Sequence, residues 1–399
     1  MFPETGSREH YKTVCLRELV EFFPCDETFR HSADKINRVL WRLEKADQVQ
    51  ARTMANLVER EGQLIQQQIK KKAEEILEHN DFTKEGKPKN SAQTFEAPAT
   101  QAFLPHETVS QKLEELNREE KVTERHVELF ELQDTFEDQN CIIANVSLDD
   151  VCCKKQKADG RKKGSPAKEK KEWTYNTVAH IQSSASDVYT LNTPNIAQML
   201  VIVLAFLCYN GLMKQSGLLV FFTDGARNLR SAISDMFSFI PYKIILDWYH
   251  LEKKCQNLLS MAINGKQIKN KIMSELLAWL WLGKVDHAIA LLRNLSEDVL
   301  KNKKEVDNLI NYFDRNRSCI PCYALRKKLG LRVSSNRVEK ANDIVVSHRQ
   351  KHNGMSWSTD GSVSLATLTA VRCNSEHMNW LREHDIRFTF KALTRKSAA

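Results

Sequence analysis

The chain lacks the cysteine pattern of a disulfide-stapled protein, although ten of its 399 residues are cysteines. Their spacings are irregular and form no disulfide framework. Cys319 and Cys322 make a Cys-x-x-Cys pair, but no second pair completes a zinc site, so we interpret both as structural. No charged segment followed by an apolar stretch opens the sequence, so we expect no secretory signal. These absences disfavour a secreted protein and indicate a reducing compartment such as the cytoplasm.

Long apolar runs and a large excess of one charge are also missing. Residues 196–213 come near to a membrane span, but these 18 residues include Gln198 and Asn210, and a span needs about 20 apolar residues. We interpret this segment as a helix buried in a protein core, and we expect no membrane partner. Lys and Arg number 59 against 51 Asp and Glu, which gives a modest net charge of +8. The length favours two or three domains with a large core.

The first part of the chain reads as helical and shows no strand pattern. Apolar residues repeat with a helical period in residues 32–45, and two further periodic stretches within residues 51–77 flank Gly62. A helix, a glycine-bearing turn and a second helix predict a DNA-binding region of helix-turn-helix type over residues 1–90. A plain helical hairpin or a piece of coiled coil explains the pattern equally well. Residues 91–140 read as a linker and a charged helix.

At Cys141 the pattern changes to alternating strands and helices. We expect strands at 141–150, 173–182, 187–191, 217–223 and 242–246, with helices at 195–213, 225–237 and 248–263. The order β-β-β-α-β-α-β-α predicts an α/β fold with a mixed sheet and helices on its faces. Residues 266–330 read as helical throughout, a last helix covers about 335–350, and residues 376–399 read as a C-terminal tail.

Three acidic residues stand out by location, and two of them follow expected strands, where open sheets usually carry chemistry. Asp149 ends the first strand with Asp150 beside it, Asp224 follows a buried strand, and Glu339 lies in the first turn of the last helix. Converging carboxylates are suitable ligands for a pair of Mg²⁺ ions. Each residue also has a structural explanation, because an Asp before a helix is a common N-cap and a Glu near a helix start complements the helix dipole. Taken together on this strand order, the three favour a site.

These motifs, in order, resemble a known family. They are SLDDVCCKKQK around Asp149, FFTDGARNL around Asp224, IILDWYHLEKKC around Asp247 and His250, and SSNRVEKANDIVVSHRQKHNGMSWS around Glu339. They are similar to those of DDE transposases of bacterial insertion sequences, and more closely to the branch related to Mutator elements. The resemblance covers about 141–265 and 320–372. It implies a ribonuclease-H-like catalytic domain over 141–265 and 331–375, interrupted by a helical insertion at 266–330.

The resemblance also implies an activity and its residues. Asp149, Asp224 and Glu339 would be the catalytic residues and the ligands of two Mg²⁺ or Mn²⁺ ions, with Asp247 and His250 in support. The reaction would be DNA strand cleavage and strand transfer at the ends of a mobile element. The partner would be double-stranded DNA, bound by a homo-oligomer in the bacterial cytoplasm at the nucleoid. Two alternatives are a catalytically inactive, transposase-derived DNA-binding protein and a ribonuclease-H-like nuclease.

Two choices among the carboxylates stay open in the sequence. Asp149 is preferred over Asp150 because it lies on the polar face of its strand, and because its Asp-x-x-x-x-Lys spacing to Lys154 matches the family. Glu339 is preferred over Glu376 and Glu383 because it starts a helix with a polar face. We expect Glu376 and Glu383 at the surface.

Basic residues gather in one segment between two expected strands. Residues 154–171 hold nine Lys or Arg against Asp159 and Glu169. Such a segment beside an active site neutralises phosphates and releases counterions. A solvated surface hairpin is the alternative. The expected DNA-binding residues are Lys154, Lys155, Arg161, Lys162, Lys163, Arg349 and Lys351.

Overall fold

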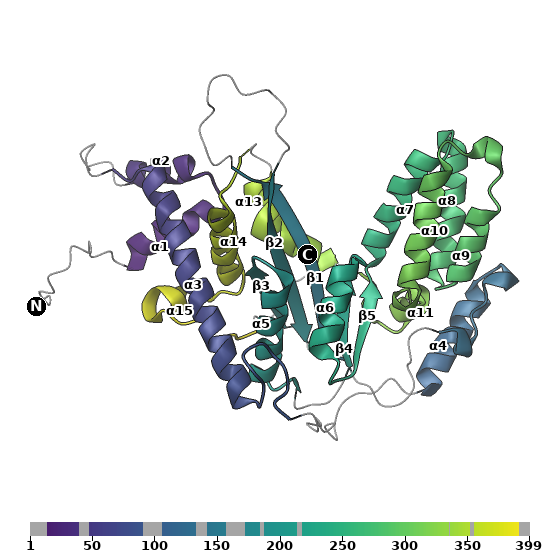
Figure 1. Cartoon of the computed structure of the whole chain (residues 1–399), viewed down its shortest axis with the longest axis horizontal. Coiled ribbons are helices and arrows are strands. Elements are labelled where there is room, and N and C mark those ends of the chain that lie inside the picture. Colours follow the sequence, from purple (N-terminus) through teal and green to yellow (C-terminus); the bar gives the residue numbers. More distant parts are fainter. Residues whose placement is uncertain are drawn as a thin grey trace, which may run out of the picture.

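A five-stranded mixed sheet lies at the centre of the molecule (Figure 1). The computed structural model describes residues 14–39, 48–90, 106–132, 142–156, 172–183, 187–213, 218–334, 336–351 and 355–390. The strands are β1 (Ile142–Lys154), β2 (Trp173–Ser183), β3 (Val188–Thr193), β4 (Leu218–Thr223) and β5 (Tyr242–Leu246). Their order across the sheet is β3-β2-β1-β4-β5.

The first three strands form an antiparallel meander, and β4 and β5 continue the sheet in parallel from β1. The helices that alternate with the later strands are α5 (Ile196–Tyr209), α6 (Arg227–Phe237) and α7 (Trp248–Ala262). The order of these elements is the one expected from the sequence. The α/β architecture with a mixed sheet is therefore confirmed.

The sheet is covered on both faces, as the continuous apolar run of β4 predicts. Leu219 and Phe221 of β4 belong to the core that α5 and α6 complete, whereas Val220 and Phe222 face the core of α7 and the helices after it. Helix α5 is buried along nearly its whole length, which confirms its interpretation as a core helix. Among the residues that the structure describes, no helix is long and apolar enough to cross a membrane.

The N-terminal helices differ from the expected arrangement. They are α1 (Val14–Phe22), α2 (Phe29–Val39) and α3 (Ala51–His79). Helix α3 is continuous over 29 residues and Gly62 lies within it, so the expected turn at Gly62 is wrong. The reason is packing: a methyl group on Gly62 would lie 2.3 Å from Cβ of Ser364 in α14 (Thr359–Cys373). The glycine allows two helices to approach closely.

A group of helices stands to one side of the sheet (Figure 1). Most of it comes from residues 266–330, which were expected to form a helical insertion. It contains α7, α8 (Lys266–Trp281), α9 (Val285–Arg293), α10 (Lys303–Asn316) and α11 (Tyr323–Lys328). Their apolar faces enclose a core of their own against Val220 and Phe222 of β4. Helix α4 (His106–Glu119) packs on α11 through a small apolar cluster.

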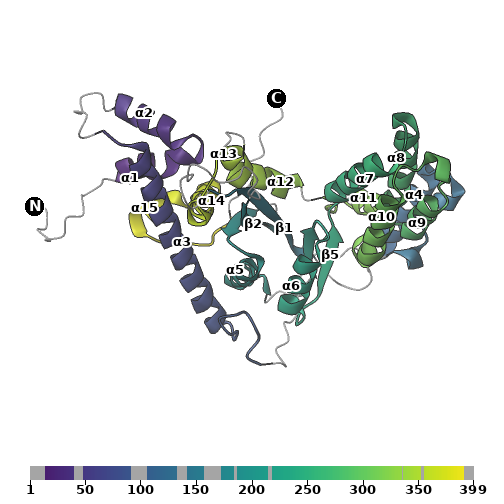
Figure 2. The ribbon, with the colours of Figure 1, turned by 45° about the horizontal axis from the view of Figure 1, so that its top comes forward.

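The last part of the chain returns to the sheet. Here α12 (Asn336–Asn342), a π-helical turn (Asp343–Ser347) and α13 (His348–Gln350) form the expected helix over 335–350, and α14 and α15 (His377–Glu383) follow. Figure 2 shows α5 and α6 on one side of the sheet and α12 and α13 on the other.

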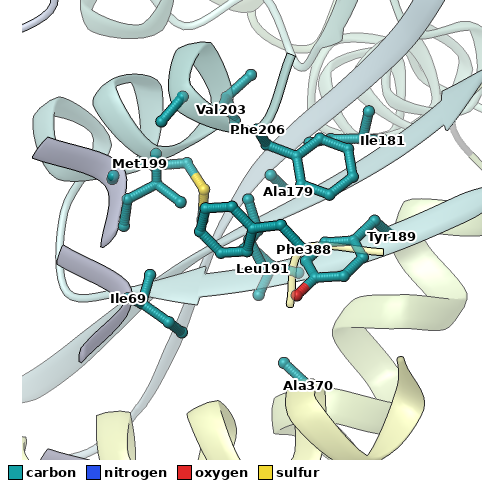
Figure 3. Close-up of a cluster of buried hydrophobic side chains, with 14 of the residues drawn as sticks. Ile69, Ala179, Ile181, Tyr189, Leu191, Met199, Val203, Phe206, Ala370 and Phe388 are labelled. Atoms are coloured by element: carbon teal, nitrogen blue, oxygen red, sulfur yellow. The ribbon is translucent and has the colours of Figure 1, made fainter. Parts of the chain in front are cut away.

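The segment expected to be a C-terminal tail is part of the core as far as it is described. Ile386 and Phe388 have no exposed surface, and the ring of Phe388 lies 5.8 Å from that of Phe206 in α5 (Figure 3). Glu376 is only 3% exposed, so its expected surface position is wrong. Its carboxylate accepts hydrogen bonds from the Tyr189 hydroxyl and from the backbone N–H of residues 387 and 389, which ties down the returning chain. Glu383 is exposed, as expected.

Candidate functional site

The register of two parallel strands brings Asp149 and Asp224 together. Ser147 of β1 pairs with Phe222 of β4. Asp149 comes two residues after Ser147, and Asp224 comes two residues after Phe222. Residues two apart in a strand point to the same face. Asp149 and Asp224 are therefore neighbours on one face, at the carboxyl end of β4. This is the edge of a parallel pair at which α/β proteins usually bind ligands.

Asp224 is held by a tight turn between β4 and α6. Its Oδ1 accepts a hydrogen bond from the backbone N–H of Ala226 at 2.8 Å, and its carbonyl accepts one from the Tyr312 hydroxyl at 3.0 Å. Gly225 has φ +82°, and a Cβ there would lie 2.9 Å from Asn316 Oδ1. A side chain at position 225 is thus excluded by conformation and by space. The turn fixes the position of the Asp224 backbone.

Asp149 is a carboxyl group in an environment that disfavours its charge. Its pKa is raised from 3.8 to about 6, mainly by burial, with Asp224 and Asp150 adding to the rise and His250 opposing it. The side-chain amide of Asn342 donates a hydrogen bond to Asp149 Oδ2 at 2.5 Å. Asn342 belongs to α12, so α12 lies on the same face of the sheet as both acids.

Asp150 lies on the opposite face of β1, because neighbouring residues of a strand alternate. Its Oδ1 accepts a hydrogen bond from the Thr177 hydroxyl of β2 at 2.6 Å. Of the two adjacent acids, the register directs Asp149 toward Asp224.

Glu339 approaches the two aspartates from α12. Its Oε1 lies 3.4 Å from Nε2 of His250, the third residue of α7. Partial burial raises the pKa of Glu339, His250 lowers it, and Asp247 and Asp149 raise it further. Asn342, one turn further along the same helix, bonds Asp149, so α12 holds Glu339 on the side of the pair, where its charged partner is His250.

Asp247 stabilises the N-terminus of α7. It is fully buried, and its side chain accepts a hydrogen bond from the backbone N–H of His250 at 3.1 Å. Asp247 is thus the N-cap of α7. By fixing the first turn of the helix, the cap holds His250 against Glu339.

The donor set suits a divalent cation in its chemistry, and only in part in its geometry. Asp149 and Asp224 offer hard carboxylate oxygens from adjacent strands, which Mg²⁺ and Mn²⁺ prefer. Glu339 bonds His250 instead. Among the described residues, no three His, Cys, Asp or Glu side chains are grouped closely enough to hold one ion. The aspartate pair fits a metal, and Glu339 joins it only by turning away from His250.

The expected DNA-binding residues fall into three groups. Lys154, Lys155 and Lys351 are exposed, and Lys155 pairs with Glu172 at 3.2 Å. Arg161, Lys162 and Lys163 lie outside the described residues.

Arg349 contradicts its expected role as a DNA-binding residue. It is only 1% exposed, and its Nε donates a hydrogen bond to the carbonyl of Pro24 at 2.9 Å. Its guanidinium stacks 5.2 Å from the Phe29 ring and 5.1 Å from the Trp357 ring. Burial lowers its pKa to about 10. Arg349 connects α13 to the N-terminal helices, so it offers no surface to DNA.

Basic residues that were not among the expected DNA-binding residues surround Asp224. Arg227 and Arg230 lie in α6, Lys253 and Lys254 in α7, and Arg315 in α10. A signal was present, since the helices after β4 and β5 both carry basic residues in their first two turns.

Comparisons with protein-family models and with curated proteins find no match for this sequence. The assignment of a function depends on the residues of this chain and their geometry.

Proposed function

We propose that this chain is a DDE-type DNA transposase with a ribonuclease-H-like catalytic domain, which cleaves and joins strands at the ends of a mobile element. The observation that carries the proposal is the register that makes Asp149 and Asp224 neighbours at the carboxyl end of β4, with Glu339 on the helix whose Asn342 bonds Asp149. The strand order and the motifs around these residues support it.

Asp149, Asp224 and Glu339 are the residues that would hold Mg²⁺ or Mn²⁺. Bound there, two such ions would activate a water or a 3′-hydroxyl as the nucleophile and would stabilise the oxygen that leaves phosphorus. The protein's own contribution is positioning. Asn342 orients the carboxylate of Asp149, and His250 holds Glu339 beside the pair until it is needed as a ligand.

The partner in this proposal is double-stranded DNA, bound by a homo-oligomer. The exposed Lys154 and Lys351 and the basic residues 161–163 supply positive charge for phosphate contacts. Such contacts fix the position of a duplex and do not depend on its sequence.

The test is a DNA cleavage assay with the purified chain in Mg²⁺ or Mn²⁺. Asp224→Asn removes one negative ligand with little change in shape, so we expect cleavage to be lost while DNA affinity stays within about twofold of wild type. Asp235→Asn, at an exposed position of α6, is the matched control and should cleave normally. Equal loss of binding and cleavage in Asp224→Asn would count against a catalytic role.

A strand-transfer assay with pre-cleaved ends separates the proposal from its rivals. Joining of the ends to a target duplex supports a transposase. Cleavage without joining supports a ribonuclease-H-like nuclease, and metal-independent binding without either reaction supports an inactive DNA-binding derivative.

A further inference from the structure

A cavity of about 410 Å³ opens beside Asp224, between the start of α6 and the facing sides of α7 and α10. Asp224 is the one acidic residue in its wall. The basic residues of the wall are Arg227, Arg230, Lys253, Lys254 and Arg315. Three separate helices therefore direct cationic side chains at one space next to the candidate catalytic carboxylate.

These five charges pair with no carboxylate within the described part of the chain, although Lys253 is near enough to Glu339 to lower the pKa of that group. None of them makes a salt bridge there. Lys254 lies 5.7 Å from the centre of the Tyr312 ring, and Lys253 lies 5.5 Å from that of Tyr249. Aromatic faces orient an ammonium group without neutralising it. The cavity thus carries a surplus of positive charge that a bound anion would offset.

Arg230, in the wall of the cavity, has a hydrogen-bond donor without an acceptor in the part of the chain that the structure describes. Its Nη1 donates a hydrogen bond to the carbonyl of Arg315 at 2.8 Å, which holds the guanidinium in place. Its Nε is buried and has no hydrogen-bond partner among the described residues. A buried donor without an acceptor is unfavourable, so a small movement of the side chain that brings Nε to a ligand oxygen would be favoured. Arginine donates in pairs to phosphate oxygens.

The start of α6 also favours a bound anion. Gly225, Ala226 and Arg227 line the cavity. The N-cap residue Ala226 has only a methyl group, which cannot accept hydrogen bonds from the backbone N–H groups of the first turn. Helix N-termini of this kind favour bound phosphate.

We propose that this cavity binds backbone phosphates of DNA next to the reacting phosphodiester, with Arg230 and Lys254 as principal contacts. The inference rests on the proposed function, because it takes its substrate class from it. The number of cations favours several phosphates of one strand over a single small anion. Continuity with Asp224 places the bound strand within reach of the carboxylates.

The test measures DNA binding by fluorescence anisotropy with the full chain, a 30-base-pair duplex and KCl from about 50 to 300 mM. Arg230→Gln with Lys254→Gln should weaken binding about tenfold or more at 100 mM. It should also lower the slope of log affinity against log salt by roughly 1.8, at about 0.9 for each lost phosphate contact. Thermal melting followed by circular dichroism verifies that the variant is folded.

The matched control is Lys303→Gln with Lys304→Gln, which removes the same charge from exposed positions of α10. These positions lie about 18 Å along the helix from Arg315. We expect a much smaller change in affinity and slope.

An affinity and salt slope equal to those of the control would overturn the inference and leave the proposed function standing. Competition by millimolar inorganic phosphate in wild type, with duplex binding unchanged in the cavity variant, would reassign the cavity to a small anion. Wild-type protein that neither binds nor cleaves DNA would overturn the proposed function itself, and the inference with it.

Discussion

At the scale of single residues, Asp149 occupies a position that is unfavourable for its own charge. Because its pKa is about 6 in the folded chain and 3.8 without the surrounding structure, the folded state binds the proton more tightly. The contribution of this group to stability is complete below pH 4 and is lost as the pH rises through about 6.

Asp149→Asn removes this charge and keeps an acceptor for Asn342. We expect the free energy of unfolding to rise by about 3 kcal/mol at pH 7.5 and to change little at pH 4. Urea denaturation at both pH values measures the difference, while DNA cleavage should be lost.

Asp150→Asn is the control on the opposite face of β1, where the carboxylate is exposed. Its effect at pH 7.5 should be clearly smaller. A destabilised Asp149→Asn at pH 7.5 would contradict the explanation by charge burial.

At the scale of elements, Gly62 determines how closely α3 and α14 pack. Gly62→Ala puts a methyl group 2.3 Å from Cβ of Ser364 and 2.5 Å from its Cα, and the Cα belongs to the backbone of another helix. Overpacking of this kind costs about 1–3 kcal/mol or more, which exceeds the gain of about 1 kcal/mol in helix propensity.

We therefore expect Gly62→Ala to lower the free energy of unfolding, measured by urea denaturation. Gln63→Ala changes the next, exposed residue of the same helix and should be nearly neutral. Equal stability of the two variants would show that the helices separate without cost.

The elements also show what the sequence could and could not predict. The apolar run of β4 and the alternation of β1 are local patterns, so strand and helix order followed from them. The close approach at Gly62 depends on Ser364, which is distant in the chain, and no period reveals it. For the same reason the sequence pattern predicts a turn at Gly62, although this residue lies inside α3.

The candidate site, too, was predictable from the sequence only in part. Asp224 follows its strand as expected, whereas the expected end of the first strand at Asp149 is wrong, because β1 continues along β2 to Lys154. The strand register then determined which of the two adjacent acids faces Asp224. The burial of Arg349 was not predictable, because a basic residue near a helix end normally faces solvent. Its position depends on the rings of Phe29 and Trp357, which lie on other elements.

At the scale of the whole molecule, the end of the described chain completes the central core. Phe388 is fully buried against Tyr189 and Phe206, although its φ of +58° is unusual for a side chain of this size. Its burial offsets the backbone strain. Phe388→Ala keeps the Cβ and the strain but leaves a cavity.

We expect Phe388→Ala to lower the free energy of unfolding by about 3–5 kcal/mol. Thermal melting should show an earlier transition for the sheet and its helices together. Thr389→Ala, at an exposed position, should melt like wild type. A wild-type melting curve for Phe388→Ala would mean that the segment is dispensable.

The pairing of α3 with α14 has a consequence for synthesis. The ribosome makes Gly62 long before Ser364, and at about 5–20 residues per second the interval is about 15–60 s. During that time α3 can pack on α1, α2 and α5 but lacks α14, and the sheet lacks one of its covering helices. The nascent chain must therefore wait, with apolar surface open to chaperones, until almost its whole length has left the ribosome. A message cut short before α14 yields a chain that cannot close its core.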